Sequence, residues 1–369
     1  MRIIMTCGGT GGHITPALAI ADTIRENIAG AELLFVGAAG GMENELVTGA
    51  GYAIRSLHVK GLSRKLGISL LREGALAVKA IGDARALLRE FAPDIVIGTG
   101  GYACYPTLFA ATRMGIPTAV HESNAVPGLA VRMLAGSVDR VWVNFPSAGK
   151  RLSSRARVLT VGNPLPRGFV GTGIAYSLPA GCRRMILSFG GSLGAAALNR
   201  AVIDLMRAER EDVYHLHATG KGGYEEFMRA FSEAGLVASG RLDIRPFIFD
   251  MPRHMASATL VICRAGAMSI SELAAAGRAA VLVPSPNVTG NHQYENAKAL
   301  YENGAGVLLE ERELVEGGLA AAVLPLLDDS ARIRAYERGI SAFSRPDANR
   351  RILEDMLGLC QKAKKHQKR

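Results

Sequence analysis

CGGTGGHITPA, residues 7–17, places four glycines within five positions, directly after an apolar segment and directly before a helix-like one. A glycine loop between a strand and a helix lets backbone N–H groups approach a ligand, and the helix start adds partial positive charge. The arrangement recurs in RMILSFGGSLGA, residues 184–195, where paired glycines and a hydroxyl residue again follow an apolar run. We interpret the repeat as two Rossmann-like domains in tandem.

Short apolar runs alternate with segments of helical periodicity along the whole chain, which predicts an α/β fold with doubly wound parallel sheets. The strands that we expect are residues 3–6, 33–36, 95–97, 118–121 and 141–143 in the first half, and 213–218, 243–246, 260–263 and 280–284 in the second. The helices that we expect include residues 17–27 and 76–91.

The domain boundary is expected within residues 161–179, which are rich in glycine and proline and poor in periodicity. This gives a first domain over residues 1–162 and a second over residues 163–343. Residues 344–369 are expected to form a helix that crosses back to the first domain and ends in a basic tail.

The composition favours acidic partners but not nucleic acid. The chain has 369 residues, of which 49% are hydrophobic, and a net charge of +10, so it is globular and basic. A basic balance suits phosphorylated small molecules, anionic lipid or nucleic acid. Aromatic residues make up only 6%, and no basic run is interleaved with them, which argues against a single-strand nucleic-acid site.

The cysteines and the N-terminus favour a cytoplasmic protein. Five widely spaced cysteines without a CxxC pair predict neither a disulfide framework nor a zinc site. The opening MRIIMTCGG leads straight from a strand into a glycine loop and lacks the sections of a signal peptide. No apolar stretch is long enough to predict a membrane span.

The glycine spacing narrows the ligand to a diphosphate or a sugar diphosphate. A P-loop requires GxxxxGK followed by Ser or Thr, whereas Gly220–Lys221 is followed by glycine. A dinucleotide site requires GxGxxG and an acidic residue about 20 positions later, and neither loop has that pattern. NAD and FAD are therefore disfavoured.

Seven motifs follow one another along nearly the whole chain. They are GGTGGHITPA at 8–17, GTGGY at 98–102, HESNAVPGLA at 121–130, VGNP at 161–164, GGSLGA at 190–195, CRAGAMSISE at 263–272 and NHQYENA at 291–297. With these motifs the chain resembles the bacterial MurG family of glycosyltransferases. The resemblance implies GT-B architecture, in which two Rossmann-like domains face a deep cleft.

The resemblance also implies a reaction. N-acetylglucosamine passes from UDP-N-acetylglucosamine, with inversion, to the C4 hydroxyl of the N-acetylmuramyl sugar of lipid I, and lipid II for peptidoglycan results. The family needs no cofactor and no metal. In agreement, the sequence has no DxD pattern of a nucleotide-sugar metal site, and His215 and His217 would face one side of a strand, as core or edge residues.

By the resemblance, residues from both domains bind UDP-N-acetylglucosamine. They are Thr10, Gly11, Gly12, Asn124, Arg167, Ser192, Ile248, Arg264, Glu272 and Gln293. The resemblance implies that Ser192 contacts the phosphates and that the backbone of Ile248 contacts the uracil. It implies that Glu272 binds the ribose and that Gln293 binds the donor sugar. Arg264 suits phosphate because its guanidinium is always charged. Two positions depart from the family pattern: His292 replaces a glutamine of some members, and an extra proline displaces Arg167.

The acceptor side belongs to the first domain. By the resemblance, Gly100, Gly101 and Tyr102 hold the acceptor pyrophosphate. His13 is the first candidate for the catalytic base, because imidazole titrates near neutral pH without special tuning. Glu122 is the second candidate, either as a base or as the residue that orients one.

Because the acceptor is a lipid, the resemblance implies a peripheral protein at the cytoplasmic face of the inner membrane. The implied partners are therefore lipid I, an anionic membrane surface and complexes with other cell-wall enzymes, but no nucleic acid. Residues 60–90 mix apolar and basic side chains, which suits an interfacial patch. The alternative is an ordinary core with a solvated basic face. The residues concerned are Leu66, Ile68, Leu70, Leu71, Leu76 and Val78 with Lys60, Arg64, Lys65, Arg72, Lys79, Arg85 and Arg89.

Three other functions remain open at this point. A GT-B enzyme could use another acceptor, a related protein could bind nucleotide sugars without turnover, and a nucleotide-sugar epimerase could share the fold. The HESNA and GTGGY loops argue against the first, and the full set of polar candidates argues against the second.

Overall fold

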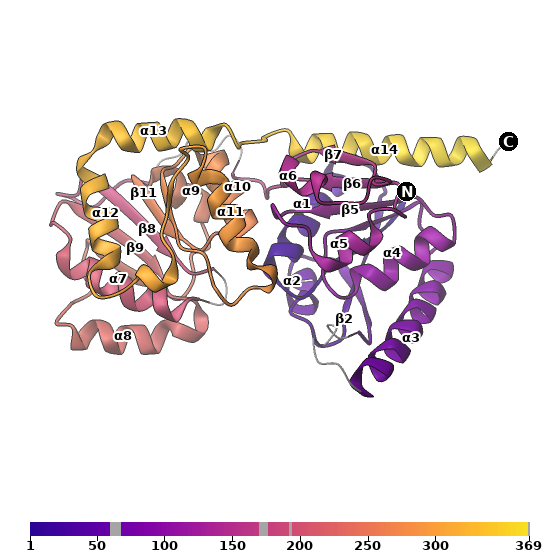
Figure 1. The fold of residues 1–369 in the computed structure, drawn as a ribbon, viewed down its shortest axis with the longest axis horizontal. Coiled ribbons are helices and arrows are strands. Elements are labelled where there is room, and N and C mark those ends of the chain that lie inside the picture. Colours follow the sequence, from indigo (N-terminus) through magenta and orange to yellow (C-terminus); the bar gives the residue numbers. More distant parts are fainter. Residues whose placement is uncertain (60–67, 170–175, 192–193, 368–369) are drawn as a thin grey trace. The chain divides into compact units, whose positions relative to one another are not determined.

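The computed structural model describes residues 1–59, 68–169, 176–191 and 194–367 (Figure 1). The chain divides into two compact units, Met1–Pro166 with Arg345–Arg369, and Arg167–Ser344. Each unit contains one sheet whose strand pairs are all parallel, with helices against it. The predicted α/β class with two doubly wound parallel sheets is confirmed.

Unit 1 holds a seven-stranded sheet in the order β3-β2-β1-β4-β5-β6-β7. Its strands are β1 (Arg2–Thr6), β2 (Glu32–Ala38), β3 (Ala53–Leu57), β4 (Ile95–Gly98), β5 (Thr118–Glu122), β6 (Arg140–Val143) and β7 (Val158–Thr160). Its helices are α1 (Gly11–Asn27), α2 (Glu43–Gly49), α3 (Ile68–Phe91), α4 (Cys104–Arg113), α5 (Leu129–Leu134), α6 (Pro146–Lys150) and α14 (Ala348–Gln367).

Strand burial in unit 1 explains which strands the sequence predicted. The central strand β4 is buried along its whole length, and such strands appear as continuous apolar runs. The edge strands β3 and β7 were missed, because β3 exposes most of its residues and β7 has only three. One face of the sheet packs under α1 and α14, and the other under α3, α4 and α5.

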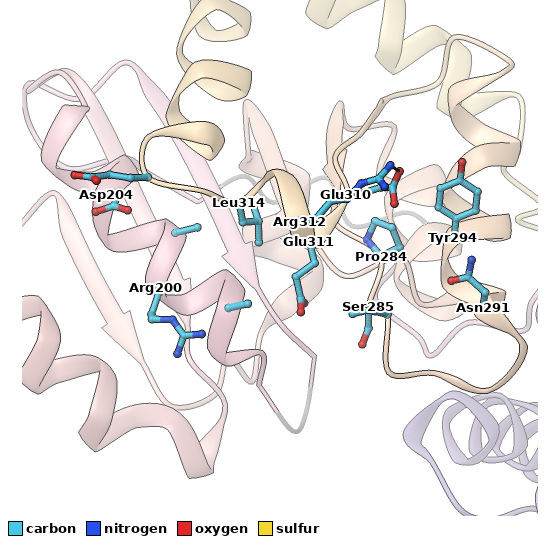
Figure 2. Close-up of a pocket in the computed structure, with 14 residues that line it drawn as sticks. Arg200, Asp204, Pro284, Ser285, Asn291, Tyr294, Glu310, Glu311, Arg312 and Leu314 are labelled. Atoms are coloured by element: carbon cyan, nitrogen blue, oxygen red, sulfur yellow. Dashed lines mark hydrogen bonds and ion pairs between the residues drawn. The ribbon is translucent and has the colours of Figure 1, made fainter.

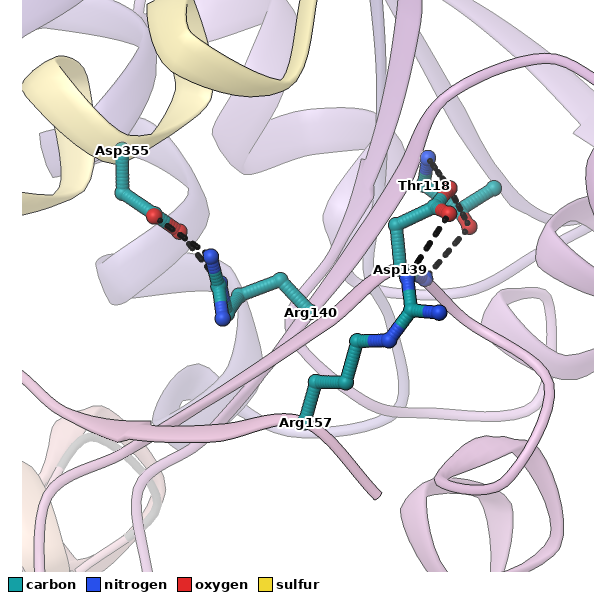
Figure 3. Close-up of polar contacts among 5 residues, drawn as sticks. All are labelled: Thr118, Asp139, Arg140, Arg157 and Asp355. Atoms are coloured by element: carbon teal, nitrogen blue, oxygen red, sulfur yellow. Dashed lines mark hydrogen bonds and ion pairs between the residues drawn. The ribbon is translucent and has the colours of Figure 1, made fainter. Parts of the chain in front are cut away.

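Hydrogen bonds and an ion pair near the middle of helix α14 connect it to strand β6 of unit 1 (Figure 3). The carboxylate of Asp355 accepts hydrogen bonds from Nε and Nη2 of Arg140, at 2.8 and 3.0 Å, and from Nε1 of Trp142 at 2.8 Å. Nearer its start, the Asn349 side chain bonds both the N–H and the carbonyl of Leu165, each at 3.0 Å. The helix thereby holds the backbone immediately before the boundary between the units.

Unit 2 repeats the winding of unit 1 in a six-stranded sheet, β10-β9-β8-β11-β12-β13. Its strands are β8 (Arg184–Phe189), β9 (Val213–Ala218), β10 (Leu242–Arg245), β11 (Leu260–Cys263), β12 (Ala280–Leu282) and β13 (Val307–Leu308). Its α-helices are α7 (Ala196–Ala208), α8 (Tyr224–Glu233), α9 (Met251–Ser257), α10 (Ala267–Ala276), α11 (His292–Tyr301), α12 (Gly318–Asp328) and α13 (Ser330–Ser341). Short 3₁₀ turns are η1 (Lys221–Gly223), η2 (Thr289–Asn291) and η3 (Glu311–Glu313).

Both sheets reverse their strand order beside the first strand of the unit, where β1 neighbours β4 and β8 neighbours β11. In open α/β sheets, ligands bind outside the carboxyl ends of the strands at this point. Within the described parts of the chain, no helix is both long and apolar enough to cross a membrane.

Candidate active site

The two glycine loops of unit 1 pack directly against each other. Gly101 has a φ of +96°, and a Cβ atom at this position would overlap the carbonyl oxygen of Gly8. Gly100 has a φ of +107°, and a Cβ atom at this position would overlap the ring of His13. Because only glycine fits at these positions, the loops after β1 and β4 form one backbone-lined cradle.

His13 is fixed in this cradle by two hydrogen bonds to Thr99. Its Nδ1 lies 2.9 Å from the Thr99 carbonyl oxygen, and the Thr99 hydroxyl donates to the His13 carbonyl at 2.7 Å. A carbonyl can only accept, so Nδ1 carries the proton of the neutral ring, and Nε2 is the nitrogen that can accept one. The geometry is that of an oriented base.

The remaining predicted residues of the cradle lie around His13. Thr10 is the exposed N-cap residue of α1, and Gly11 and Gly12 form the first turn of that helix, where backbone N–H groups have no intrahelical acceptor. Tyr102 is 57% exposed, and its ring lies beside Gly9. The structure therefore brings these residues of the two motifs together in unit 1.

A buried carboxylate that the sequence analysis missed supports the first loop. Glu43, at the start of α2, is fully buried; it accepts the Gly9 N–H at 3.1 Å and the Ala38 N–H at 2.7 Å. A Cβ at Gly8 or Gly41 would overlap this carboxylate. Because an acidic residue in the first turn of a helix is usually solvated, this role could not be predicted from the sequence.

Glu122 is turned into its own loop. It is 2% exposed; Oε1 accepts from the backbone and side-chain N–H groups of Asn124, at 2.9 and 3.1 Å, and Oε2 accepts the Gly128 N–H at 2.8 Å. Burial raises the pKa of Glu122 above its usual range, although these hydrogen bonds act in the opposite direction. The geometry suits a residue that positions Asn124. It does not support Glu122 as the base.

The glycine loop of unit 2 is built in a similar way. Gly191 and Gly194 have φ values of +89° and +76°, and a Cβ at Gly194 would overlap the Thr219 carbonyl oxygen. Asn199 of α7 donates to that same oxygen at 3.0 Å. The loops after β8 and β9 are thereby joined. Ser192, expected to contact phosphate, lies outside the described residues.

A buried polar chain lies immediately before these two loops. The Ser188 hydroxyl is 2.6 Å from Nε2 of His215 and 2.7 Å from Nδ1 of His217, and Nδ1 of His215 is 2.6 Å from Glu209 Oε1. Burial, followed by the charge of His215, lowers the pKa of His217 to about 3. Both histidines are core residues, as expected, and the chain ties β8 to β9.

The residue expected at the uracil is flanked by exposed aromatic rings. The Ile248 side chain is buried, whereas Phe249 is 90% exposed and Phe247 is partly exposed. Their ring centroids lie 5.0 Å apart at a steep angle. Rings of this kind offer faces for stacking with a base. Neither ring could be predicted from the sequence, because neither lies within one of the seven motifs.

Glu272 lies on α10 and is partly buried. Burial raises its pKa to about 7. In the part of the chain that the structure describes, it has no ion-pair partner. A carboxyl in this condition can ionise when a ligand offers hydroxyl donors.

Arg264 has a different environment from the one expected. Its Nη1 lies 3.3 Å from the carbonyl oxygens of both Val283 and Pro284, and its Nη2 forms an ion pair with Glu311. The guanidinium therefore links the loops after β11, β12 and β13. This geometry does not support its pairing with a phosphate.

The sugar candidate Gln293 lies in the first turn of α11. Its Oε1 accepts the Ser285 N–H at 2.9 Å, so its amide NH₂ is the group that can donate to a ligand. The neighbouring His292 is partly buried.

Arg167 is exposed and is the first residue of unit 2. Among the described residues, no cluster of three or more His, Cys, Asp or Glu side chains could hold a metal.

A hollow of about 710 Å³ lies beside Gln293 and Arg264 within unit 2 (Figure 2). One wall is the exposed side of α7, and the other is formed by the loops after β12 and β13. The hollow is lined by Ser285 and Glu311. The N–H of Ser285 donates to Gln293, and Glu311 forms an ion pair with Arg264.

Comparison with known proteins identifies the family. Residues 3–143 match the glycosyltransferase family 28 N-terminal domain, and residues 185–352 match its C-terminal domain. The chain is 40% identical to the UDP-N-acetylglucosamine–N-acetylmuramyl-(pentapeptide) pyrophosphoryl-undecaprenol N-acetylglucosamine transferase of Desulforudis audaxviator, with 98% of each chain covered. It is 38% identical to the Acetivibrio thermocellus protein of that name, covering 96% of this chain and 97% of the relative.

Solved structures agree with the sequence comparison. The crystal structure of Acinetobacter baumannii MurG matches with a TM-score of 0.77 and 28% identity, over 98% of this chain and 99% of that one. The Staphylococcus aureus MnaA–UDP structure, at 14% identity and a TM-score of 0.68 over 97% of this chain and 98% of that one, shows only the shared fold. The chain therefore belongs to glycosyltransferase family 28 and, within it, to the MurG family of N-acetylglucosamine transferases.

Proposed function

We propose that this protein transfers N-acetylglucosamine from UDP-N-acetylglucosamine to the C4 hydroxyl of the N-acetylmuramyl sugar of lipid I, which forms lipid II. The observation that carries the proposal is the orientation of His13. Its Nδ1 proton is donated to the Thr99 carbonyl, so Nε2 can take a proton beside a glycine cradle suited to a pyrophosphate.

Each unit supplies one half of the reaction. In unit 1, the backbone at Gly100 and Gly101, with Tyr102, holds the acceptor pyrophosphate. In unit 2, the Ile248 backbone and the Phe247 and Phe249 rings hold uracil. Glu272 accepts hydrogen bonds from the ribose, and Gln293 donates to the sugar. Thr10, Gly11, Gly12, Asn124, Arg167 and Ser192 keep their predicted donor contacts in this proposal.

The chemistry follows from these roles. The acceptor O4 attacks the anomeric carbon and forms the new C–O bond as the bond to the diphosphate oxygen breaks, with its electron pair leaving on UDP. His13 Nε2 takes the O4 proton. Backbone N–H groups at the unit 2 glycine loop and the start of α7 stabilise the charge that develops on the diphosphate.

The direct test offers UDP-N-acetylglucosamine with a labelled sugar, with and without a lipid I analogue. We expect label in the lipid fraction only when the acceptor is present. Label in free epimerised sugar would indicate an epimerase, and binding without transfer would indicate a nucleotide-sugar-binding protein. Either result would replace the proposed function.

Removal of the base gives a second prediction. His13→Ala should lower kcat by about 10²- to 10⁴-fold, because a positioned base contributes about that much, and should leave the KM for UDP-N-acetylglucosamine nearly unchanged. His58→Ala, an exposed histidine of the same unit, is the control and should retain wild-type turnover. Near-normal turnover in His13→Ala would remove the assignment.

Glu272 gives a pH-dependent prediction. Ribose hydroxyls donate to the ionised carboxylate, and burial raises the pKa of Glu272 to about 7. The Kd for UDP-N-acetylglucosamine should therefore fall by about tenfold between pH 6 and pH 8, as that carboxyl ionises. Glu272→Gln should bind more weakly at pH 8 and show no such trend. Glu226→Gln, at an exposed glutamate of α8, should retain it.

The same substitution separates a ligand role from a structural one. An acid whose folded pKa is raised binds more protons in the native state, so its burial costs stability as pH rises above the unfolded value. Glu272→Gln should therefore unfold less readily than wild type at pH 8, by about 2 kcal/mol, and the difference should shrink towards pH 5. A variant that loses both binding and stability would mark Glu272 as a structural residue.

We also propose that unit 1 associates peripherally with an anionic membrane. Helix α4 packs against α3 and α5 in one layer, which carries exposed Val78, Leu129 and Met133. Arg132 and Arg151 line a hollow of about 400 Å³ beside the latter two. Apolar side chains with a basic rim suit an anionic interface. Of the predicted patch, residues 60–67 and the side chains of residues 68–75 lie outside the description.

Charge reversal tests this surface. Arg132→Glu with Arg151→Glu should weaken sedimentation with phosphatidylglycerol vesicles by about tenfold or more, since each basic residue near an anionic surface contributes about 1 kcal/mol. Turnover of a short-chain soluble acceptor should stay unchanged. The control, Arg207→Glu with Arg229→Glu, reverses two exposed charges of unit 2. Equal vesicle binding by the test and control proteins would contradict the surface.

A further inference from the structure

The hollow of unit 2 has walls of mixed charge. Arg200 and Asp204 line it from α7 (Figure 2). Glu316 lines it from the loop after η3. The three other charged residues of the hollow are already paired: Glu311 with Arg264, and Glu310 with Arg312 at 2.7 Å. In the described ranges, Arg200, Asp204 and Glu316 have no ion-pair partner. One cation and two carboxylates are therefore available to a ligand.

Hydrogen-bonding and apolar groups complete the lining. Tyr294 and Asn291 contribute a phenol and an amide from the start of α11, and Ser285 contributes a hydroxyl. Ala197, Ala201, Pro284, Pro286 and Leu314 supply apolar surface. Phenol, amide and hydroxyl groups among small apolar side chains suit a peptide that carries both carboxylate and amino groups.

The hollow adjoins the proposed donor-sugar site. The side chain of Gln293, the proposed sugar contact, accepts the N–H of Ser285, which lines the hollow. In the N-acetylmuramyl acceptor, the attacking O4 is on the carbon next to C3, which carries the peptide through a lactyl ether. The peptide must therefore leave the reaction centre within about one sugar ring of the donor sugar.

We propose that this hollow binds the peptide of the acceptor, an inference that rests on the function proposed above. Arg200 pairs with a carboxylate of the peptide, and Asp204 and Glu316 pair with its amino group. The paired residues Glu311 and Arg264 keep the loops that form the wall in place. The hollow thereby makes the enzyme selective for acceptors that carry the peptide.

The test uses two short-chain lipid I analogues, one with the complete pentapeptide and one that ends at the lactyl group. Wild type should have the lower KM for the pentapeptide analogue. Arg200→Ala, and Asp204→Asn with Glu316→Gln, should each raise that KM by about tenfold, as expected for the loss of a charged hydrogen bond. The KM values for the lactyl analogue and for UDP-N-acetylglucosamine should not change. Arg207→Ala, on the same helix outside the hollow, is the control.

Each other outcome is decisive. Equal KM values of wild type for the two analogues, or variants that raise both equally, would overturn peptide recognition. A raised KM for UDP-N-acetylglucosamine alone would assign the hollow to the donor. If wild type labels neither analogue, the proposed function itself fails, and the inference falls with it. Unchanged UDP-N-acetylglucosamine affinity in the variants checks that unit 2 remains folded.

Discussion

The carbonyl of Gly8 leaves no room for a side chain at position 101, and the site of unit 1 depends on this contact. Strands β1 and β4 are neighbours where the sheet order reverses, so the loops that follow them emerge side by side. Glycine at 100 and 101 lets them touch, and the contact brings Thr99 to His13. Any side chain at position 101 would separate the loops and release the imidazole from its acceptor.

In unit 2, a glycine also packs against a backbone carbonyl of the neighbouring loop, but other residues stabilise the loops. Gly194 packs on the Thr219 carbonyl as Gly101 packs on Gly8, again between loops of adjacent strands. Under the unit 1 loops lies the carboxylate of Glu43, which accepts backbone N–H groups. Before the unit 2 loops lies the chain of Ser188 and two histidines, which joins the strands themselves. Repetition of the winding therefore did not require repetition of the residues that stabilise each loop.

The sequence predicted the central strands, both glycine loops and the family, because these depend on local patterns. It missed the edge strands β3, β7 and β13, whose positions require few apolar residues. It also missed Glu43, whose carboxylate accepts the N–H of Gly9, 34 positions earlier in the chain. Arg264 was expected at a phosphate because arginine suits phosphate, but its partner Glu311 follows 47 positions later and cannot be found by spacing. Local motifs indicate which residues can act, whereas tertiary contacts determine which are already engaged.

The lack of an ion-pair partner in the described part of the chain has a consequence for Glu272. A carboxyl buried without a cation has a raised pKa, and its ionisation costs free energy. An arginine paired with it would remove that cost, but would also occupy the oxygens that ribose hydroxyls need. Among the described residues Glu272 has no such partner, so its oxygens keep their acceptor capacity for a ligand. In the proposed site, the ribose hydroxyls of the nucleotide would donate hydrogen bonds to this carboxylate, and part of the binding free energy would offset its desolvation.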